Sequence, residues 1–280
     1  MPWARKAFLI SLAAGAGALA IPAQGHFIGE AQAQSLLCPP GFVRVPSGTF
    51  TMGSPPTEGD ADEHPAHTLT LAGFCMERLE VTVAEYEACI AAGACTPTGT
   101  DTQCNMQPQN RPARSNHPIN CVDFQQASSY CSYIGARLPT EPEWEYAARG
   151  SDGRKYPWGN APPSPRLLNE CGDECAAYAA SLPTPETKKP MYSGSDGWAE
   201  TSPVGSYPRG ASPFGILDIA GNVYEWTSSP YCNYPQHNCS SQYRMYRGGG
   251  WYTEKSAAVA VRNGNLMTDK SVVVGIRCAK

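Results

Sequence analysis

The chain has 280 residues, of which 41% are hydrophobic and 16% are charged, and its formal net charge is −4. This hydrophobic content excludes a disordered chain, and the acidic balance argues against a nucleic-acid partner, which needs a basic surface. The 27 Gly and 26 Pro residues predict a loop-rich fold with few, short helices.

Residues 1–33 have the pattern of a signal peptide. Arg5 and Lys6 precede an apolar run, and small residues end at Ala31-Gln-Ala33, a cleavage motif. We therefore expect a mature product over residues 34–280, either secreted or held in the periplasm or cell envelope, with no stable membrane span. An uncleaved anchor is the alternative, because the apolar run is almost long enough to cross a bilayer.

Two short segments near the start of the mature chain are predicted strands. Phe42-Val-Arg-Val45 precedes a Pro-Ser-Gly turn, and His67-Thr-Leu-Thr-Leu71 alternates as a half-buried strand does. His64 and His67 have a spacing that could serve a metal ion. No cysteine or third histidine lies nearby, so we favour an ordinary polar loop.

Three helices are predicted from capping boxes, in which an oxygen side chain is followed three residues later by Glu or Gln. Glycines at positions 93 and 135 end the first two helices. Pro142 falls in the first turn of the third helix, where its missing N–H has no cost. The three boxes are Thr82 with Glu85, Asp123 with Gln126, and Thr140 with Glu143.

Residues 151–210 are rich in Pro, Gly and Ser and are predicted to be irregular. So long a run without secondary structure is uncommon in a folded domain unless cysteines or cations fix it. All 12 cysteines follow residue 33, and their even number in an exported chain predicts disulfides. Short spacings favour three pairs: Cys89 with Cys95, Cys171 with Cys175, and Cys232 with Cys239.

The stretch Gly215–Trp226 places Asp218 and Glu225 on either side of a Gly221-Asn222 turn. The two carboxylates and the carbonyls of the turn could converge on calcium, which accepts this mixture of oxygen ligands. Asp and Asn are also common turn residues. The alternative is that Asp218 caps a turn and Glu225 pairs with an arginine.

This stretch resembles the Gly-Leu-x-Asp-x-x-Gly-Asn-x-x-Glu-Trp signature of the formylglycine-generating-enzyme, or sulfatase-modifying-factor, family. Further similar blocks follow in family order from about residue 40 to the C-terminus. They are Val45–Gly53, Leu79–Thr82, His117–Val122, Arg137–Arg149, Pro157–Gly159, Pro203–Gly205, Arg247–Trp251 and Gly275–Cys278. The resemblance implies a single domain over residues 34–280. Its expected fold is α+β, a C-type-lectin-like variant with little regular secondary structure and several disulfides.

The resemblance also implies structural calcium and one long-range disulfide. Cys131 would pair with Cys278, which leaves Cys38 with Cys75 and Cys104 with Cys121 as the remaining assignments. The second calcium site matches more loosely than the first, and the alternative for it is polar loop residues that face water. The first site comprises Asp218 and Glu225 with the carbonyls of Gly221 and Val223, and the second Asn169 and Asp196 with the carbonyls of Glu170 and Trp198.

Family members that oxidise a sulfatase cysteine to formylglycine carry two cysteines after an Arg-Gly-Gly-Ser-aromatic motif, and their thiolates bind copper(I). The matching positions here are Thr253 and Ala258, and Gly250 replaces the motif's serine. We therefore do not expect copper. The positions matching a second family disulfide are Ala148 and Asn263, so both of its cysteines are missing together.

The sequence accordingly favours a calcium-stabilised binding module for a peptide, a glycan or an envelope protein, because a scaffold can persist after its chemistry is lost. The alternatives are an oxidoreductase that forms formylglycine with another metal arrangement, or a different enzyme on this scaffold. Side chains that could supply acid and base are Glu254, Lys255, Arg262 and Arg277, and rings that could line a groove or fill the core are Trp198, Tyr224, Trp226, Trp251 and Tyr252.

Overall fold

The computed structural model describes residues 37–235, 238–254 and 257–280. The predicted signal peptide, with its cleavage site, lies outside the described residues, and so does Lys255. In the described ranges, no helix combines the length and apolar character needed to cross a membrane.

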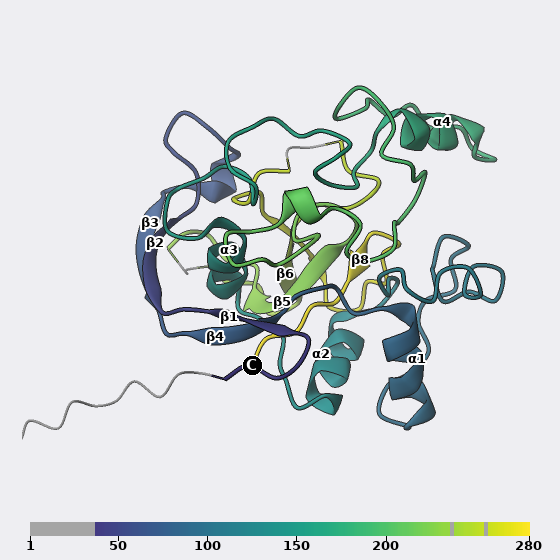
Figure 1. Ribbon diagram of the computed structural model, residues 1–280, viewed down its shortest axis with the longest axis horizontal. Helices are drawn as coiled ribbons and strands as arrows, with labels where there is room; N and C mark the ends of the chain where they lie inside the picture. Colours follow the sequence, from purple (N-terminus) through teal and green to yellow (C-terminus); the bar gives the residue numbers. More distant parts are fainter. Residues whose placement is uncertain (1–36, 236–237, 255–256) are drawn as a thin grey trace, which may run out of the picture. The chain divides into compact units, whose positions relative to one another are not determined.

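The described strands form three small sheets (Figure 1). The first two are antiparallel pairs, β1 (Phe42–Val45) with β4 (Phe74–Glu77) and β2 (Gly48–Met52) with β3 (His67–Leu71). The predicted strands at 42–45 and 67–71 are thus confirmed. The third sheet has the order β7-β6-β5-β8, built from β5 (Tyr224–Pro230), β6 (Tyr243–Arg247), β7 (Asn263–Leu266) and β8 (Val274–Gly275).

Each predicted capping box is present and opens a helix. At the first, the Glu85 N–H donates to Thr82 Oγ1 over 3.2 Å, and the Thr82 N–H donates to Glu85 Oε2 over 2.8 Å. Such reciprocal bonds satisfy N–H groups that have no partner within the helix. The helices are α1 (Val83–Ala91), α2 (Phe124–Tyr133) and α3 (Glu141–Arg149).

A fourth helix, α4 (Asp173–Ser181), corrects the prediction that residues 151–210 are irregular throughout. Its N-cap is Gly172, which has no side chain to form a capping box, so the signal that revealed the other helices is missing. Four alanines among its nine residues supply helix propensity instead. The Cys171–Cys175 disulfide also joins the residue before the N-cap to the first turn. Two short 3₁₀ turns, η1 (Ala61–Glu63) and η2 (Pro208–Gly210), complete the described helical elements.

Helix α3 packs against β2, β5 and β6 and carries buried charges on the face that meets them. Glu141, Glu145 and Arg149 lie at i, i+4 and i+8, which places them on one stripe of the helix. The Glu141 carboxylate lies 2.8 Å from Arg262, and the Glu145 carboxylate pairs with both Arg149 and Arg247. Each of these buried charges thus lies beside a charge of opposite sign, which offsets the cost of removing it from water.

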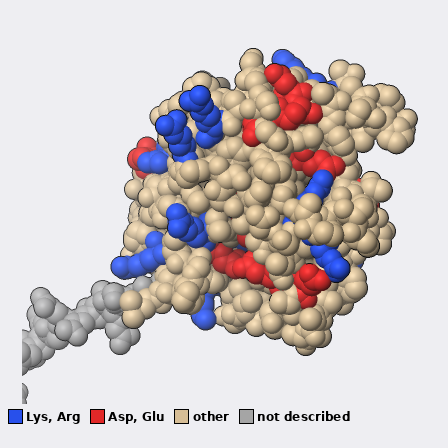
Figure 2. Space-filling model, turned by 45° about the vertical axis from the view of Figure 1, so that its right-hand side comes forward, with Lys and Arg blue, Asp and Glu red and all other residues tan. Residues whose placement is uncertain are grey.

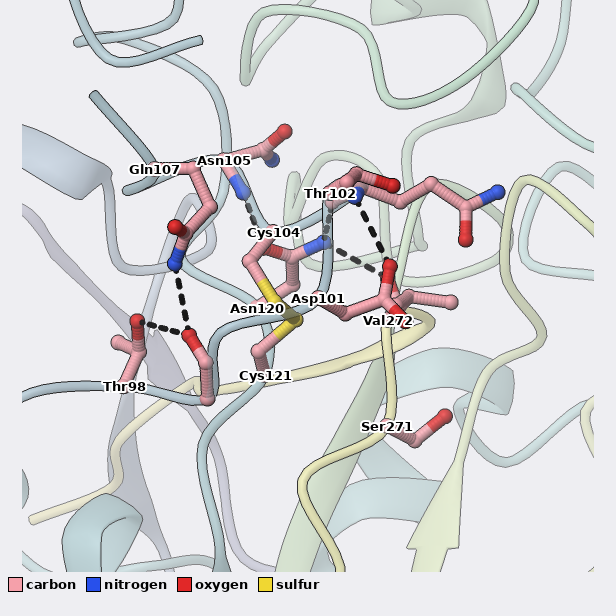
Figure 3. The surroundings of a disulfide bond; sticks show 12 residues. Thr98, Asp101, Thr102, Cys104, Asn105, Gln107, Asn120, Cys121, Ser271 and Val272 are labelled. Carbon is pink, nitrogen blue, oxygen red and sulfur yellow. Dashed lines mark hydrogen bonds between the residues drawn. A yellow bond between two sulfur atoms is a disulfide. The ribbon is translucent and has the colours of Figure 1, made fainter. Parts of the chain in front are cut away.

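All 12 cysteines form six disulfides, and every predicted pair is confirmed. The Cys131–Cys278 bond joins α2 to the C-terminal segment across 147 residues, worth about 5 kcal/mol in the chain-entropy description. Figure 3 shows the Cys104–Cys121 bond beside Asn120, whose amide donates to the Val272 carbonyl over 2.7 Å. The bonds are Cys38–Cys75, Cys89–Cys95, Cys104–Cys121, Cys131–Cys278, Cys171–Cys175 and Cys232–Cys239.

Candidate functional site

Thr253, the first position where the resemblance places a copper cysteine, is half-buried and hydrogen-bonded. Its Oγ1 accepts from the Gly250 N–H over 3.0 Å and donates to the Tyr224 hydroxyl over 3.3 Å. Because all 12 cysteines of the chain are in disulfides, no thiol from elsewhere can replace the missing one. The residues present do not fit copper(I), which needs soft sulfur ligands.

A segment that we call the strap, Glu186–Lys189, lies against the residues on both sides of Thr253. The Tyr252 hydroxyl donates to Glu186 Oε2 over 2.9 Å, and the Lys189 N–H donates to Glu254 Oε1 over 2.5 Å. The Lys188 ammonium lies 4.0 Å from the centre of the Tyr252 ring. The strap belongs to the proline-rich stretch between α4 and Met191, so this stretch is held against the position of the first copper cysteine.

Ala258, the position of the second copper cysteine, lines a cavity of about 630 Å³. The backbone beside it is fixed, because the Val259 N–H donates to the Lys155 carbonyl over 2.9 Å. The walls carry both acidic and basic side chains, and Lys155 lies 2.6 Å from Glu58. The charged lining residues are Glu58, Asp60, Glu63, Arg149, Arg154 and Lys155.

Side chains of both charges also lie on the outer surface of the molecule. On the face drawn in Figure 2, basic and acidic side chains lie interspersed among uncharged residues. Within the cavity, Arg149 is only 6% exposed, and its Nη2 lies 3.1 Å from Glu145 on the buried stripe of α3. The Nε of Arg149 has no hydrogen-bond partner. The cavity wall is therefore continuous with the buried ion pairs of α3.

The first predicted calcium site is a buried cluster of carboxylates around Arg277. Glu225 is fully buried; its Oε1 lies 2.7 Å from Arg277, and its Oε2 accepts from Trp144 Nε1 over 2.6 Å. Asp218 takes a left-handed conformation with φ of 52°, and its Oδ2 accepts from the Gly205 N–H. Glu225 therefore pairs with an arginine, as the alternative interpretation of the sequence predicted. Asp218 Oδ1 is buried and has no hydrogen-bond partner.

Glu80 belongs to the same cluster, and sequence reasoning missed it as a site residue. It is 2% exposed, and Oε1 has no partner, while Oε2 accepts from the Asn222 amide over 3.0 Å. Burial first, and then the nearby Asp218, raises the pKa of Glu80 well above its usual value. Glu80 lies within the similar block Leu79–Thr82, which could have drawn attention to it. Two buried carboxylates with unpartnered oxygens fit a cation, which would stabilise both charges.

At the second predicted calcium site, both oxygens of Asp196 and the Glu170 carbonyl already have hydrogen-bond partners within the chain. The Tyr192 hydroxyl lies 2.6 Å from Asp196 Oδ2 and 2.9 Å from the Glu170 carbonyl, and Asp196 Oδ1 accepts from the Trp198 N–H over 2.9 Å. Only Asn169 Oδ1 is without a partner among the predicted side-chain ligands. Burial, followed by the neighbouring Glu174, raises the pKa of Asp196 to about 8. Sequence reasoning did not identify Tyr192 as a site residue. Its hydroxyl contacts the same oxygens that a cation would bind here.

No group of three or more His, Cys, Asp or Glu side chains in the described ranges is arranged to hold a metal. Both calcium sites depend on carbonyl and amide oxygens as well, so they stay predictions. His64 and His67 contact the backbone, through Glu58 O at 2.9 Å and Pro65 O at 3.0 Å. His64 thus lies in a polar loop, as expected, whereas His67 is the first residue of β3.

Most of the remaining candidate residues from the sequence lie in buried ion pairs or in the hydrophobic core. Arg262 and Arg277 are buried in ion pairs with Glu141 and Glu225. Trp226 and Trp251 are each 1% exposed or less, whereas Trp198 is 37% exposed. Tyr224, Trp226 and Trp251 therefore lie in the core, whereas Tyr252 is half-buried and Trp198 is exposed.

The profile described as "Sulfatase-modifying factor enzyme 1-like domain" matches residues 29–280. The chain belongs to this family. The membership accounts for the shared blocks in their family order, and it does not by itself assign an activity.

Known proteins similar to this sulfatase-modifying-factor domain differ in their activities. It is 32% identical to the formylglycine-generating enzyme of Streptomyces coelicolor, over 85% of this chain and 88% of that protein. It is 29% identical to the hercynine oxygenase of Mycolicibacterium smegmatis, over 85% of this chain but only 60% of that protein. The structure of PvdO from Pseudomonas aeruginosa matches with a TM-score of 0.66 and 28% identity, over 85% of this chain and 93% of PvdO. The expected fold, the sulfatase-modifying-factor variant of the C-type-lectin-like fold, is confirmed.

Proposed function

We propose that this domain is an exported, calcium-stabilised ligand-binding module that keeps the family scaffold and lacks its copper oxidase chemistry. The proposal rests on the absence of free thiols to bind copper. Thr253 and Ala258 occupy the two copper positions, and all 12 cysteines are in disulfides. A hydroxyl and a methyl group cannot replace two thiolates as copper(I) ligands.

Calcium is assigned a structural role at the cluster of Glu80, Asp218 and Glu225. Asp218 Oδ1 and Glu80 Oε1 are buried without partners and would hold the ion together with the Gly221 and Val223 carbonyls. Bound calcium supplies positive charge that offsets the repulsion between the carboxylates. Asn169 and Asp196, with the Glu170 and Trp198 carbonyls, would hold a second ion less tightly, because Tyr192 already bonds there.

The ligand occupies the cavity at Ala258. Its walls combine three acidic and three basic side chains with apolar patches at Pro55 and Val261. Among peptide, glycan and envelope-protein ligands, this mixture best suits a peptide segment that carries both charges, because pockets are specific through a few placed polar groups. The six disulfides and the predicted signal peptide support a secreted, periplasmic or cell-envelope location.

Two measurements test the proposal. A copper(I) competition titration against a chelator should find no site in the wild-type protein, whereas the Thr253→Cys/Ala258→Cys variant should gain one. Peptides selected from a display library should lose at least about tenfold affinity for Ala258→Trp, which fills the cavity. Copper(I) binding by the wild type, or peptide binding that survives Ala258→Trp with an unchanged melting temperature, would refute it.

The alternative is an oxidoreductase, as the names of the two sequence relatives suggest, or another enzyme on this scaffold. Glu254 would be the nearest acid or base to Thr253, but it accepts a hydrogen bond from the strap. An enzyme would turn over a substrate in the cavity at Ala258, so a product formed from a selected peptide would favour this alternative.

A further inference from the structure

A second cavity, of about 330 Å³, lies away from Ala258, between the segment 113–117, helix α4 and the segment 197–201. Its size falls at the lower end of small-molecule sites. The side chains that give it character are Arg114, His117, Tyr178, Trp198, Glu200 and Thr201.

The charges in this wall cancel. Arg114 Nη1 lies 2.5 Å from Glu200 Oε2, and the two side chains are 23% and 13% exposed. Burial and the adjacent Arg114 lower the pKa of His117 to about 4, so its ring is neutral at neutral pH. Burial and the adjacent Glu200 raise the pKa of Tyr178 to about 12, so its hydroxyl keeps its proton. A charged ligand would thus find no opposite charge that is not already paired.

Trp198 gives the cavity an exposed aromatic surface. It is 37% exposed, one of few large apolar side chains that face solvent in the described ranges. Its ring meets His117 edge-on with centroids 5.4 Å apart, which holds the indole in one orientation. Indole faces attract C–H groups, which are weakly positive at their hydrogens.

The polar groups beside Trp198 are fixed in place by Asn105. The Asn105 amide donates to Thr201 Oγ1 over 2.9 Å, and its Oδ1 accepts from Arg114 Nη1 over 2.9 Å. Thr201 Oγ1 also lies 3.0 Å from His117 Nδ1. Figure 3 shows the Asn105 backbone beside the Cys104–Cys121 disulfide, where its N–H donates to Asn120 Oδ1 over 2.7 Å. A polar wall fixed in this way loses little entropy when a ligand binds.

We propose that this second cavity binds an uncharged saccharide of one or two rings, stacked on Trp198 with its hydroxyls on Arg114, Glu200 and Tyr178. Sugar rings have an apolar C–H face, which suits the indole, and neighbouring hydroxyls that donate and accept at short spacing. The Arg114–Glu200 pair is partly exposed and offers a guanidinium donor next to a carboxylate acceptor at that spacing. The site is separate from the peptide cavity and does not depend on it.

The test uses a panel of glucose, galactose, mannose, N-acetylglucosamine and their disaccharides, measured by tryptophan fluorescence and by NMR saturation transfer. We expect at least one neutral sugar to bind the wild type saturably. Trp198→Ala should lose at least about tenfold affinity, and Trp198→Phe, which keeps a ring, should lose less. Tyr133→Ala removes another exposed ring, 44% exposed on α2, and should bind as the wild type does.

The variants also separate this site from the proposed function. Ala258→Trp should leave sugar binding unchanged, and Trp198→Ala should leave peptide binding unchanged. Failure of every sugar in the panel to bind, binding that survives Trp198→Ala, or stronger binding of glucuronate or glucosamine than of any neutral sugar would each overturn the inference. Peptides that bind at Trp198 in place of sugars would overturn it as well.

Discussion

The Glu225 carboxylate lies 2.7 Å from the Arg277 guanidinium, and both side chains are fully buried. Glu225 is in β5, and Arg277 follows β8, the strand that runs parallel to β5. The Arg277 guanidinium also donates to the Glu77 and Leu217 carbonyls over 3.1 and 2.9 Å. The pair thereby joins three segments that lie far apart in the sequence.

Removing Arg277 should leave Glu225 as an unpaired buried charge. We expect Arg277→Met to lower the free energy of unfolding by about 3–5 kcal/mol, because the carboxylate loses its partner while it stays out of water. Urea denaturation at neutral pH measures this loss. The matched control is Arg111→Met, whose pair with Glu87 is about half exposed on both sides and should be worth less than about 1 kcal/mol. Similar losses in the two variants would contradict the assigned role of Arg277.

Calcium should stabilise the domain through Asp218 and Glu80. Chelation of the exported protein should lower its melting temperature by about 5 °C or more, because a ligand that binds only the folded state adds stability. Asp218→Ala and Glu80→Gln should each abolish this response, whereas Asp152→Ala, on an exposed carboxylate, should retain it. A wild-type melting curve that is the same with calcium and with chelator would refute the assignment.

A side chain at Gly249 should be destabilising because it would collide with Glu170. A Cβ on Gly249 would lie 2.1 Å from Glu170 Oε1, and its φ is +84°. Gly93 has a similar φ of +74° with open space around it, so Gly93→Ala carries the backbone strain alone. We expect Gly249→Ala to lose about 1–3 kcal/mol more than Gly93→Ala does, measured by urea denaturation.

Glu170→Ala should restore part of that loss in the double variant, since it removes the colliding carboxylate. Equal losses from the two glycine substitutions, or no recovery on adding Glu170→Ala, would show that Glu170 does not limit this position.

Glu77 should make stability fall as the pH rises. Burial raises its pKa from 4.5 to about 7, although the Cys278 N–H donates to it over 2.6 Å. Between pH 4.5 and 7 the folded state therefore holds a proton that the unfolded state has released. Stability from this group is complete below about pH 4.5 and is lost as the pH rises through 7, by at most about 3 kcal/mol.

The matched variant for this prediction is Glu77→Gln, which can still accept from the Cys278 N–H. The difference in unfolding free energy between wild type and variant should decline from pH 5 to pH 8. A difference that is flat, or that grows with pH, would contradict the raised pKa.

What could be predicted from the sequence was local, or came from the family's ordered blocks. Thr82 and Glu85 are three residues apart, so their capping box is visible in the sequence, and the helix follows from it. Helix α4 begins at a glycine N-cap and gave no such signal. The alanines of α4 favour a helix, but the many prolines of residues 151–210 led to the prediction of irregular structure.

The candidate site depends on contacts between distant residues. The sequence indicated an arginine or calcium as the partner of Glu225. It did not indicate that Arg277 is the arginine, because no local spacing connects the two residues. Glu80 lies near Asp218 only in the folded chain, where the segment before α1 packs against the Gly215–Trp226 stretch. Tyr192 contacts Asp196 from four residues away, yet its role depends on the Glu170 carbonyl, which only the folded chain places beside it.

An oxidation assay on the purified exported protein tests whether the domain lacks copper oxidase chemistry. The protein is incubated with copper, a reductant, oxygen and a Cys-x-Pro-x-Arg peptide, and the mass of the cysteine-containing product is followed. The Streptomyces coelicolor formylglycine-generating enzyme serves as the positive control. We predict an unchanged peptide mass, because Thr253 and Ala258 offer no thiolate to copper. Conversion of the peptide cysteine to formylglycine would contradict it.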